Sequence, residues 1–127
     1  MAAKKVLIAE DSSVIQNLTR KILEFQNFEI TAVKNGKEVL KALETVNFDI
    51  ILMDINMPQM DGMTCAKEIR KLSDPVKSKV PIVAITGNAR NYSDSDFQEA
   101  GINEYLPKPL DFDKLVETVK NLTSSNS

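Results

Sequence analysis

The feature that most constrains this sequence is the alternation of short apolar runs with longer segments of helical period. Five runs have the length and composition of strands, and the last is the weakest: 6–9, 28–33, 50–53, 81–85 and 104–106. Between them, apolar residues recur every three or four positions, which is typical of amphipathic helices packed on a sheet. Strands that alternate with helices predict an α/β fold built on a parallel sheet.

Capping residues mark where the predicted helices begin. Ser13 and Gln16 have the spacing of a capping box, and Asn35 and Asp61 precede the second and third helices. The apolar positions of the first helix, which we expect to share one face, are Val14, Ile15, Leu18, Ile22 and Phe25. The other predicted helices lie in the segments 39–46, 63–72, 88–100 and 112–122.

The apolar pattern also predicts the order of the strands. The run 50–53 is apolar on both faces, as expected of a central strand covered on both sides, and the run 6–9 is similarly continuous. The run 28–33 alternates between apolar and polar residues, which predicts an edge strand. These features fit a flavodoxin-like (βα)5 three-layer sandwich with a parallel sheet of order 2-1-3-4-5.

The length and composition narrow the class of protein. We expect a single domain over residues 1–127, with its core at 4–122 and a polar tail at 123–127. The net charge of −2 argues against a nucleic-acid-binding surface. The sequence also lacks a run of about 18 apolar residues, which a membrane-spanning helix would need. The single Cys65 and the short apolar stretch near the N-terminus predict a cytoplasmic protein.

The sequence contains no histidine, and this absence excludes several kinds of site. Histidine-based catalytic triads, phosphohistidine carriers and histidine-ligated zinc sites all need the missing residue. With one cysteine as well, a bound metal must rest on oxygen ligands, which suit Mg²⁺, Ca²⁺ or Mn²⁺.

Polar side chains follow four of the five predicted strands. Glu10 and Asp11 follow the first strand, Asp54 the third, Thr86 the fourth and Lys108 the fifth. Since the site of such a sheet lies beyond the carboxyl ends of its strands, we expect these side chains to converge. Three carboxylates in one crevice repel each other, so either some of them hold protons or a cation lies among them, and Mg²⁺ suits such a cluster.

This set of residue types is suited to phosphoryl transfer. A carboxylate such as Asp54 can accept a phosphoryl group beside Mg²⁺, while an ammonium and a hydroxyl contact the phosphoryl oxygens. Each residue also has an ordinary alternative, because Asp11 could cap a helix, Thr86 could end a strand and Lys108 could be a solvated loop residue. Their joint occurrence at successive strand ends favours the functional interpretation.

The pattern resembles the receiver domain of two-component response regulators over residues 4–122. The resemblance implies that Asp54 is the phosphoacceptor within Ile51-Leu52-Met53-Asp54-Ile55-Asn56-Met57-Pro58. It also implies that Mg²⁺ or Mn²⁺ is held by Glu10, Asp11, Asp54 and the backbone carbonyl of Asn56. Glu10 stands where the family more often has aspartate.

The resemblance assigns further roles around Asp54. Lys108 matches the invariant lysine of the family, whose bond to the following proline is usually cis. Thr86 and Tyr105 match the switch pair, in which the hydroxyl moves and the aromatic ring turns inward. The positions that tune the lifetime of the phosphoryl group are Asn56, Gly87 and Asn88.

The resemblance also implies partners and a response. The donor is a phosphohistidine on a histidine kinase or a histidine phosphotransfer domain, and small phosphodonors support Mg²⁺-dependent self-phosphorylation, followed by self-dephosphorylation. Phosphorylation changes the surface formed by the segment 88–100, the last strand and the last helix. The reader of this signal is a downstream protein or an attached output domain, and a phosphorylation-dependent homodimer is a further expectation. The segment 80–86 resembles receivers of hybrid kinases.

Three alternatives from other classes fit the sequence less well. A phosphatase of the haloacid-dehalogenase family needs an acid two residues after the nucleophile, where this chain has Asn56. A flavodoxin needs a phosphate-binding loop after the first strand, where Glu10 and Asp11 would repel a phosphate. A calcium loop that begins at Asp54 would need glycine at its sixth position and glutamate at its twelfth, which are Gln59 and Cys65.

Overall fold

The computed structural model describes residues 3–87 and 92–124, which form a five-stranded parallel sheet and six helices. The strands are β1 (Lys5–Ala9), β2 (Glu29–Val33), β3 (Ile50–Asp54), β4 (Ile82–Thr86) and β5 (Glu104–Pro107). They pair in the order β2-β1-β3-β4-β5, with the alternating strand β2 at one edge and the fully buried β3 at the centre. The predicted α/β fold and strand order are therefore confirmed.

One of the helices is absent from the prediction. The helices are α1 (Ser13–Phe25), α2 (Gly36–Thr45), α3 (Gly62–Arg70), α4 (Pro75–Ser78), α5 (Asp94–Ala100) and α6 (Phe112–Thr123). The unpredicted α4 is a single turn, too short for a periodic pattern, and its only sequence signal is Pro75 directly after the capping residue Asp74. Within the described residues, every helix is too short or too polar to cross a membrane.

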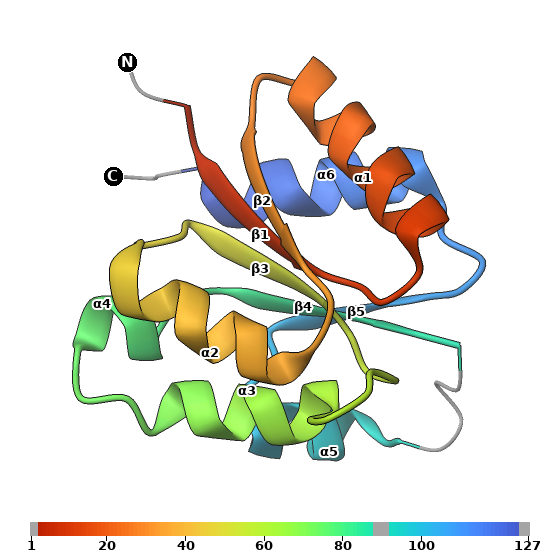
Figure 1. The fold of residues 1–127 in the computed structure, drawn as a ribbon. Helices are drawn as coiled ribbons and strands as arrows, with labels where there is room; N and C mark the ends of the chain where they lie inside the picture. Colours follow the sequence, from red (N-terminus) through yellow and green to blue (C-terminus); the bar gives the residue numbers. More distant parts are fainter. Residues whose placement is uncertain (1–2, 88–91, 125–127) are drawn as a thin grey trace.

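The helices form two layers that cover the sheet on both sides (Figure 1). Helices α1 and α6 pack on one face, while α2, α3 and α5 pack on the other. Strand β3 serves both cores, because Ile50 and Leu52 point to the first face and Ile51 and Met53 to the second. The loops at the carboxyl ends of the strands therefore stand on a sheet that is buried from both sides.

Helix α1 begins one residue earlier than the predicted capping box implies. The Ser12 hydroxyl accepts a hydrogen bond from the Ile15 amide at 3.4 Å, so Ser12 rather than Ser13 is the N-cap. The Gln16 side chain does not complete a box with Ser13 and is directed to other carbonyl groups. Adjacent serines have the same capping chemistry, so the sequence alone did not distinguish them.

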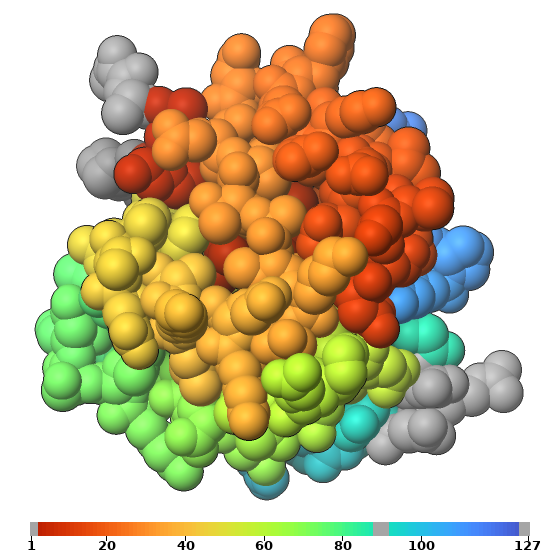
Figure 2. Space-filling view, viewed as in Figure 1, coloured from red at the N-terminus to blue at the C-terminus, as the bar shows by residue number. Residues whose placement is uncertain are grey.

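The predicted apolar face of α1 is covered only in part. Val14, Leu18 and Phe25 are 71%, 46% and 84% exposed, and α1 lies at the surface of the molecule in Figure 2. The side chains that α1 buries are Thr19 and Leu23. The Thr19 hydroxyl is satisfied inside the helix by donating to a backbone carbonyl at 2.8 Å. Helix α1 thus turns apolar side chains toward solvent.

Two polar segments differ in extent from the prediction. Within 88–100, the helix α5 begins after Ser93, whose side chain forms a capping box with Asp96, and residues 88–91 lie outside the described residues. At the C-terminus, α6 takes in Thr123, whose buried hydroxyl donates to a backbone carbonyl at 2.7 Å. Polar hydroxyl residues can thus belong to a helix when their side chains find acceptors within it.

Candidate functional site

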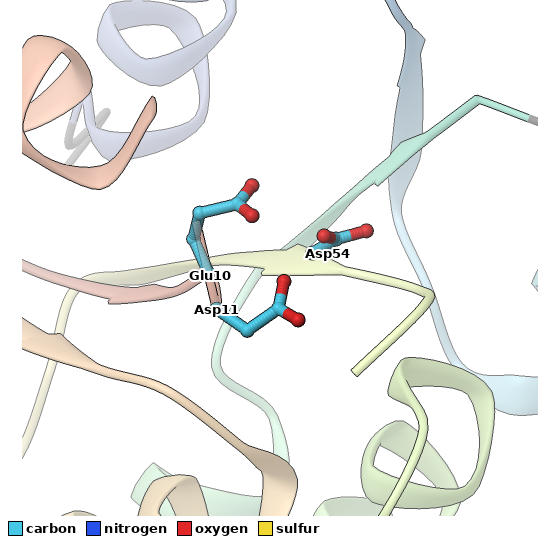
Figure 3. Close-up of side chains that lie close together, drawn as sticks. All are labelled: Glu10, Asp11 and Asp54. Atoms are coloured by element: carbon cyan, nitrogen blue, oxygen red, sulfur yellow. The ribbon is translucent and has the colours of Figure 1, made fainter. Parts of the chain in front are cut away.

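The polar residues at the strand ends meet at one edge of the sheet. Strands β1 and β3 pair in parallel register, so the residues that follow them emerge side by side. Glu10 and Asp11 belong to the connection between β1 and α1, while Asp54 is the last residue of β3. Figure 3 shows the three carboxyl groups close together at these strand ends.

The three carboxyl groups form a compact oxygen cluster. One oxygen each from Glu10, Asp11 and Asp54 lies within 4.8 Å of the other two. Glu10 and Asp54 are 3% and 2% exposed, whereas Asp11 faces solvent. Two negative charges about 4 Å apart repel by roughly 4 kcal/mol at an effective dielectric near 20. A divalent cation would reverse this repulsion, and an all-oxygen donor set open on one side fits Mg²⁺ or Mn²⁺.

A lysine approaches the same cluster from β5. The Lys108 ammonium lies 3.1 Å from Oδ2 of Asp54, and the amide of Asn56 donates to Oδ1 at 3.1 Å. The Lys108 amide also donates to the Thr86 carbonyl, which anchors the lysine beside the end of β4. The peptide bond between Lys108 and Pro109 is cis, as the family resemblance implied. Asp54 thus lies between the Lys108 ammonium and the carboxyl groups of Glu10 and Asp11.

Glu10 is the acid of the cluster whose ionisation the fold opposes. Burial raises its pKa from 4.5 to about 7, and this effect outweighs the hydrogen bond from the Ser12 amide, which lowers the pKa. The negative charge of Asp54 raises the pKa further, while the positive charge of Lys108 lowers it. Glu10 is therefore partly protonated near neutral pH, and a bound cation would favour the loss of that proton.

The connection that carries the acidic pair is held by Gln16. Its side-chain amide donates to the Glu10 carbonyl at 3.0 Å and to the Val33 carbonyl at 2.9 Å. The Glu10 amide also donates to Val33, at 3.1 Å, while the Glu10 carboxylate accepts from the Ser12 amide at 3.0 Å. Gln16 therefore joins the ends of β1 and β2 beside the acidic pair. The sequence predicts a capping role for Gln16 instead, although a lone amide near the start of an apolar helix face is a signal for this one.

The loop after Asp54 returns closely to the strand it leaves. The Gly62 amide donates to the Ile55 carbonyl at 2.9 Å. A Cβ atom at residue 62 would lie 2.7 Å from the Asp54 carbonyl oxygen, so a side chain there would displace the backbone of the central acid. The Asp61-Gly62 pair thus combines a cap for α3, through a bond to Thr64, with a close approach that only glycine permits.

The remaining predicted residues lie at the ends of β4 and β5. Thr86 is fully buried, and Tyr105 is 39% exposed. The register pairs Ala84 with Tyr105 and Thr86 with Pro107. The side chains of Thr86 and Tyr105 therefore belong to the same face of the sheet. A Cβ atom at Gly87 would lie 3.8 Å from the Lys108 side chain, which is ordinary contact. The predicted tuning residue Asn88 lies outside the described residues.

An apolar groove of about 300 Å³ opens beside the site lysine. Ile15 and Leu18 of α1 line one side, and Pro109 and Phe112 line the other, with Lys108 at the end that leads to Asp54. Leu18, which is 46% exposed, is both part of this lining and part of the exposed surface of α1. A concave apolar surface beside the reactive groups can receive an apolar side chain of a partner protein.

Comparison with known proteins identifies the family. The family model described as the response regulator receiver domain matches residues 6–120, a span that contains every residue of the site. The chain is 38% identical over 120 residues to hybrid signal transduction histidine kinase M of Dictyostelium discoideum. The matched region takes up 92% of this chain but only 5% of the length of the kinase. It is 29% identical over 118 residues to the polar-differentiation response regulator DivK of Brucella anthropi, with 93% and 94% of the two chains covered.

A solved structure with the same architecture supports this family. It is the receiver domain of the sensor histidine kinase PA1611 from Pseudomonas aeruginosa, which has a magnesium ion coordinated in its active site cleft. It matches this chain with a TM-score of 0.87 at 31% identity and covers 98% of this chain and 100% of its own. The chain therefore belongs to the response regulator receiver domains of two-component systems, regulatory domains that accept a phosphoryl group on an aspartate.

Proposed function

We propose that this chain accepts a phosphoryl group on Asp54 from a phosphohistidine and changes shape in response. The observation that carries the proposal is the setting of the Asp54 carboxylate, which is 2% exposed and lies between the acidic pair and the Lys108 ammonium. An aspartate with a purely structural role needs neither a facing lysine nor two further carboxylates. Membership of the receiver family supports the same assignment.

The transfer is a nucleophilic displacement at phosphorus. A carboxylate oxygen of Asp54 forms the new O–P bond as the P–N bond of the donor breaks, and the electron pair stays on the imidazole nitrogen, which solvent protonates. The Lys108 ammonium, 3.1 Å from the Asp54 carboxylate, stabilises the charge on the phosphoryl oxygens. Small phosphodonors such as acetyl phosphate support the same reaction. Water later releases inorganic phosphate and restores the carboxylate, so the chain is a phosphoacceptor rather than an enzyme.

The residues that would hold Mg²⁺ or Mn²⁺ are Glu10, Asp11 and Asp54, together with the backbone carbonyl of Asn56 that the family resemblance implies. When bound, the cation offsets the negative charge of the carboxylates and of the phosphoryl oxygens. The compact oxygen cluster supports this part of the proposal, as does the magnesium ion in the cleft of the PA1611 receiver domain.

Thr86 and Tyr105 carry the response in this proposal. The Thr86 hydroxyl moves toward the phosphoryl group, and the Tyr105 ring turns inward to fill the space, which alters the surface of α5, β5 and α6. The common face of the two side chains and the 39% exposure of Tyr105 support such a movement. Asn56, Gly87 and Asn88 tune the lifetime of the phosphoryl group.

The donor and the reader of the signal are proteins in this proposal. The donor is a histidine kinase or a histidine phosphotransfer domain, which the relation to hybrid kinases supports. It docks beside Lys108, where the apolar groove supplies a surface for it. An attached output domain or a downstream protein reads the altered surface, and a phosphorylation-dependent homodimer is one form of that reading. The proposal includes a cytoplasmic location, with which the unpaired Cys65 thiol agrees.

Intact mass spectrometry after incubation with acetyl phosphate and Mg²⁺ tests the proposal. We expect one phosphoryl adduct on the wild-type chain and none when a chelator replaces Mg²⁺. Asp54→Asn should remove the adduct, because an amide has no nucleophilic carboxylate oxygen. Asp113→Asn, at an exposed aspartate in the first turn of α6, is the matched control and should keep it. An adduct that persists in Asp54→Asn with the same metal dependence would contradict the assignment.

A further inference from the structure

The ring of Tyr105 rests on another ring. Its centroid lies 4.7 Å from that of Phe97 on α5, and the two planes differ by 18°, so the rings are stacked. Phe97 is 3% exposed and belongs to the core between the sheet and α2, α3 and α5. Its ring also meets Tyr92, at 5.6 Å and 50°. The buried Phe97 thus provides a fixed platform for a half-exposed Tyr105.

The stack competes with the inward position of Tyr105. Tyr105 and Thr86 lie on one face of the sheet on adjacent strands, two positions apart in register, so a Tyr105 ring that turns toward Thr86 must leave Phe97. A ring cannot hold both positions, because the stack requires it to lie nearly parallel to Phe97. Each contact that favours the outward position therefore disfavours the switched state.

We propose that Phe97 is a positioning residue that holds Tyr105 in its outward position and thereby sets the threshold for switching. This inference rests on the proposed function, in which phosphorylation of Asp54 draws Tyr105 inward. It adds that α5 is not only moved by the switch. Through the stack on Phe97, α5 raises the free energy that phosphorylation must supply to move Tyr105 inward.

The size of the effect follows from linkage. A stacked aromatic pair contributes enough to shift a two-state equilibrium by about two- to ten-fold. A ligand that prefers the switched state has an apparent affinity that depends on how often the protein adopts that state. While the outward state predominates, removing the stack raises this apparent affinity by the same factor. Removing the stack while keeping the core filled should therefore tighten the binding of a phosphoryl mimic.

The experiment uses Phe97→Leu, which fills much of the same space without a ring. Phe48→Leu is the matched control, because Phe48 is 6% exposed in the same core and has no ring contact among the described residues. Both changes are made in a Tyr92→Phe background. The chain has no tryptophan and two tyrosines, so Tyr105 is then the dominant source of fluorescence. The probe is beryllofluoride with Mg²⁺, a stable mimic of a phosphoryl group on a carboxylate.

We expect Phe97→Leu to lower the apparent Kd for beryllofluoride by about two- to ten-fold. Without beryllofluoride, its Tyr105 emission should shift toward that of the bound state. Phe48→Leu should lose comparable stability to urea but keep the Kd of the background. Equal Kd values in the two leucine variants would overturn the inference while leaving the proposed function intact. No beryllofluoride response in any variant, together with no acetyl phosphate adduct, would overturn the proposed function as well.

Discussion

Glu10 keeps its carboxyl group almost closed to solvent, and this makes the stability of the metal-free protein depend on pH. Its pKa is raised from 4.5 to about 7, so in this range the folded state binds a proton that the unfolded state releases. The contribution of Glu10 to the free energy of unfolding therefore falls as the pH rises from about 4.5 to 7, by at most about 3 kcal/mol. Urea unfolding in a chelator at several pH values measures it, and Glu10→Gln should be more stable than wild type above pH 7.

Two comparisons isolate this effect from other titrating groups. Glu44→Gln, at an exposed position on α2, should keep the pH dependence of the wild type. Saturating Mg²⁺ should reduce the difference between Glu10→Gln and wild type at high pH, because the cation favours the ionised carboxyl group. Parallel pH profiles for Glu10→Gln and wild type in the chelator would contradict this account.

Gln16 acts on the metal site through the backbone of Glu10 rather than through a ligand atom. Its two hydrogen bonds, at 3.0 and 2.9 Å, hold the connection after β1 against the end of β2. Gln16→Met keeps the length of the side chain and removes both bonds, and residues that orient metal ligands typically contribute about ten-fold or more to affinity. We expect the Kd for Mg²⁺, measured by calorimetry, to rise by about ten-fold.

Gln26→Met is the matched control for Gln16→Met, because Gln26 caps the other end of α1 through its backbone amide. It should leave the affinity for Mg²⁺ unchanged. If Gln16→Met lowered stability to urea but kept the affinity, Gln16 would be a structural residue only.

Each residue of the cluster could be predicted from the sequence, but the hydrogen bonds that hold these residues in place could not. Glu10, Asp11, Asp54 and Lys108 each follow an apolar run, and a parallel sheet must bring such positions together. The sequence predicts a capping box for Gln16 because it shows the spacing from Ser13 and not the carbonyl groups that surround the Gln16 amide. Contacts between a side chain and a distant backbone depend on packing, which no local pattern records.

At the scale of elements, the exposed apolar face of α1 has a testable consequence for phosphotransfer. Leu18 is 46% exposed and lines the groove beside Lys108. Leu18→Ser should slow transfer from a phosphorylated histidine phosphotransfer domain by about ten-fold, the usual scale for an interface residue of this kind. Self-phosphorylation from acetyl phosphate should stay unchanged, because that donor needs no protein interface. Rapid-quench kinetics with both donors measure the two rates.

Phe25 offers the control for this prediction. It is 84% exposed at the far end of the same helix and does not line the groove. Phe25→Ser should leave both rates unchanged, and equal slowing by Leu18→Ser and Phe25→Ser would argue against docking at the groove.

The elements themselves differ in how far the sequence predicts them. Strand β3 is buried along its whole length, so its continuous apolar run was a strong signal. The face that α1 buries was not predictable to the same degree, because Thr19 points inward while Val14 and Phe25 stay outside. A helical period shows which side chains share a face, but the neighbouring elements decide which face is covered.

At the scale of the molecule, the site and the main structural clamp lie at opposite ends of the sheet. Arg70 at the end of α3 donates to the carbonyls of Gly101, Ser78 and Val80 and to the Asn103 side chain. These acceptors lie at or near the starts of β4 and β5, away from Asp54. Burial lowers the pKa of Arg70, and within the described residues no carboxylate pairs with it. Carbonyl dipoles therefore take the place of a carboxylate partner for its half-buried charge.

This separation predicts that the clamp contributes to stability without affecting the metal site. Arg70→Met leaves several half-buried acceptors without a donor, so the free energy of unfolding should fall by about 2 to 4 kcal/mol in urea titrations. The Kd for Mg²⁺ should stay within about two-fold of wild type, because the hydrogen bonds of Arg70 share no partner with the acidic cluster at the other end of the sheet. Lys71→Met, at the exposed neighbour that pairs with Glu68 on the helix surface, should change the free energy of unfolding by about 0.5 kcal/mol or less. A loss of Mg²⁺ affinity in Arg70→Met as large as that in Gln16→Met would mean that the two ends of the sheet are coupled.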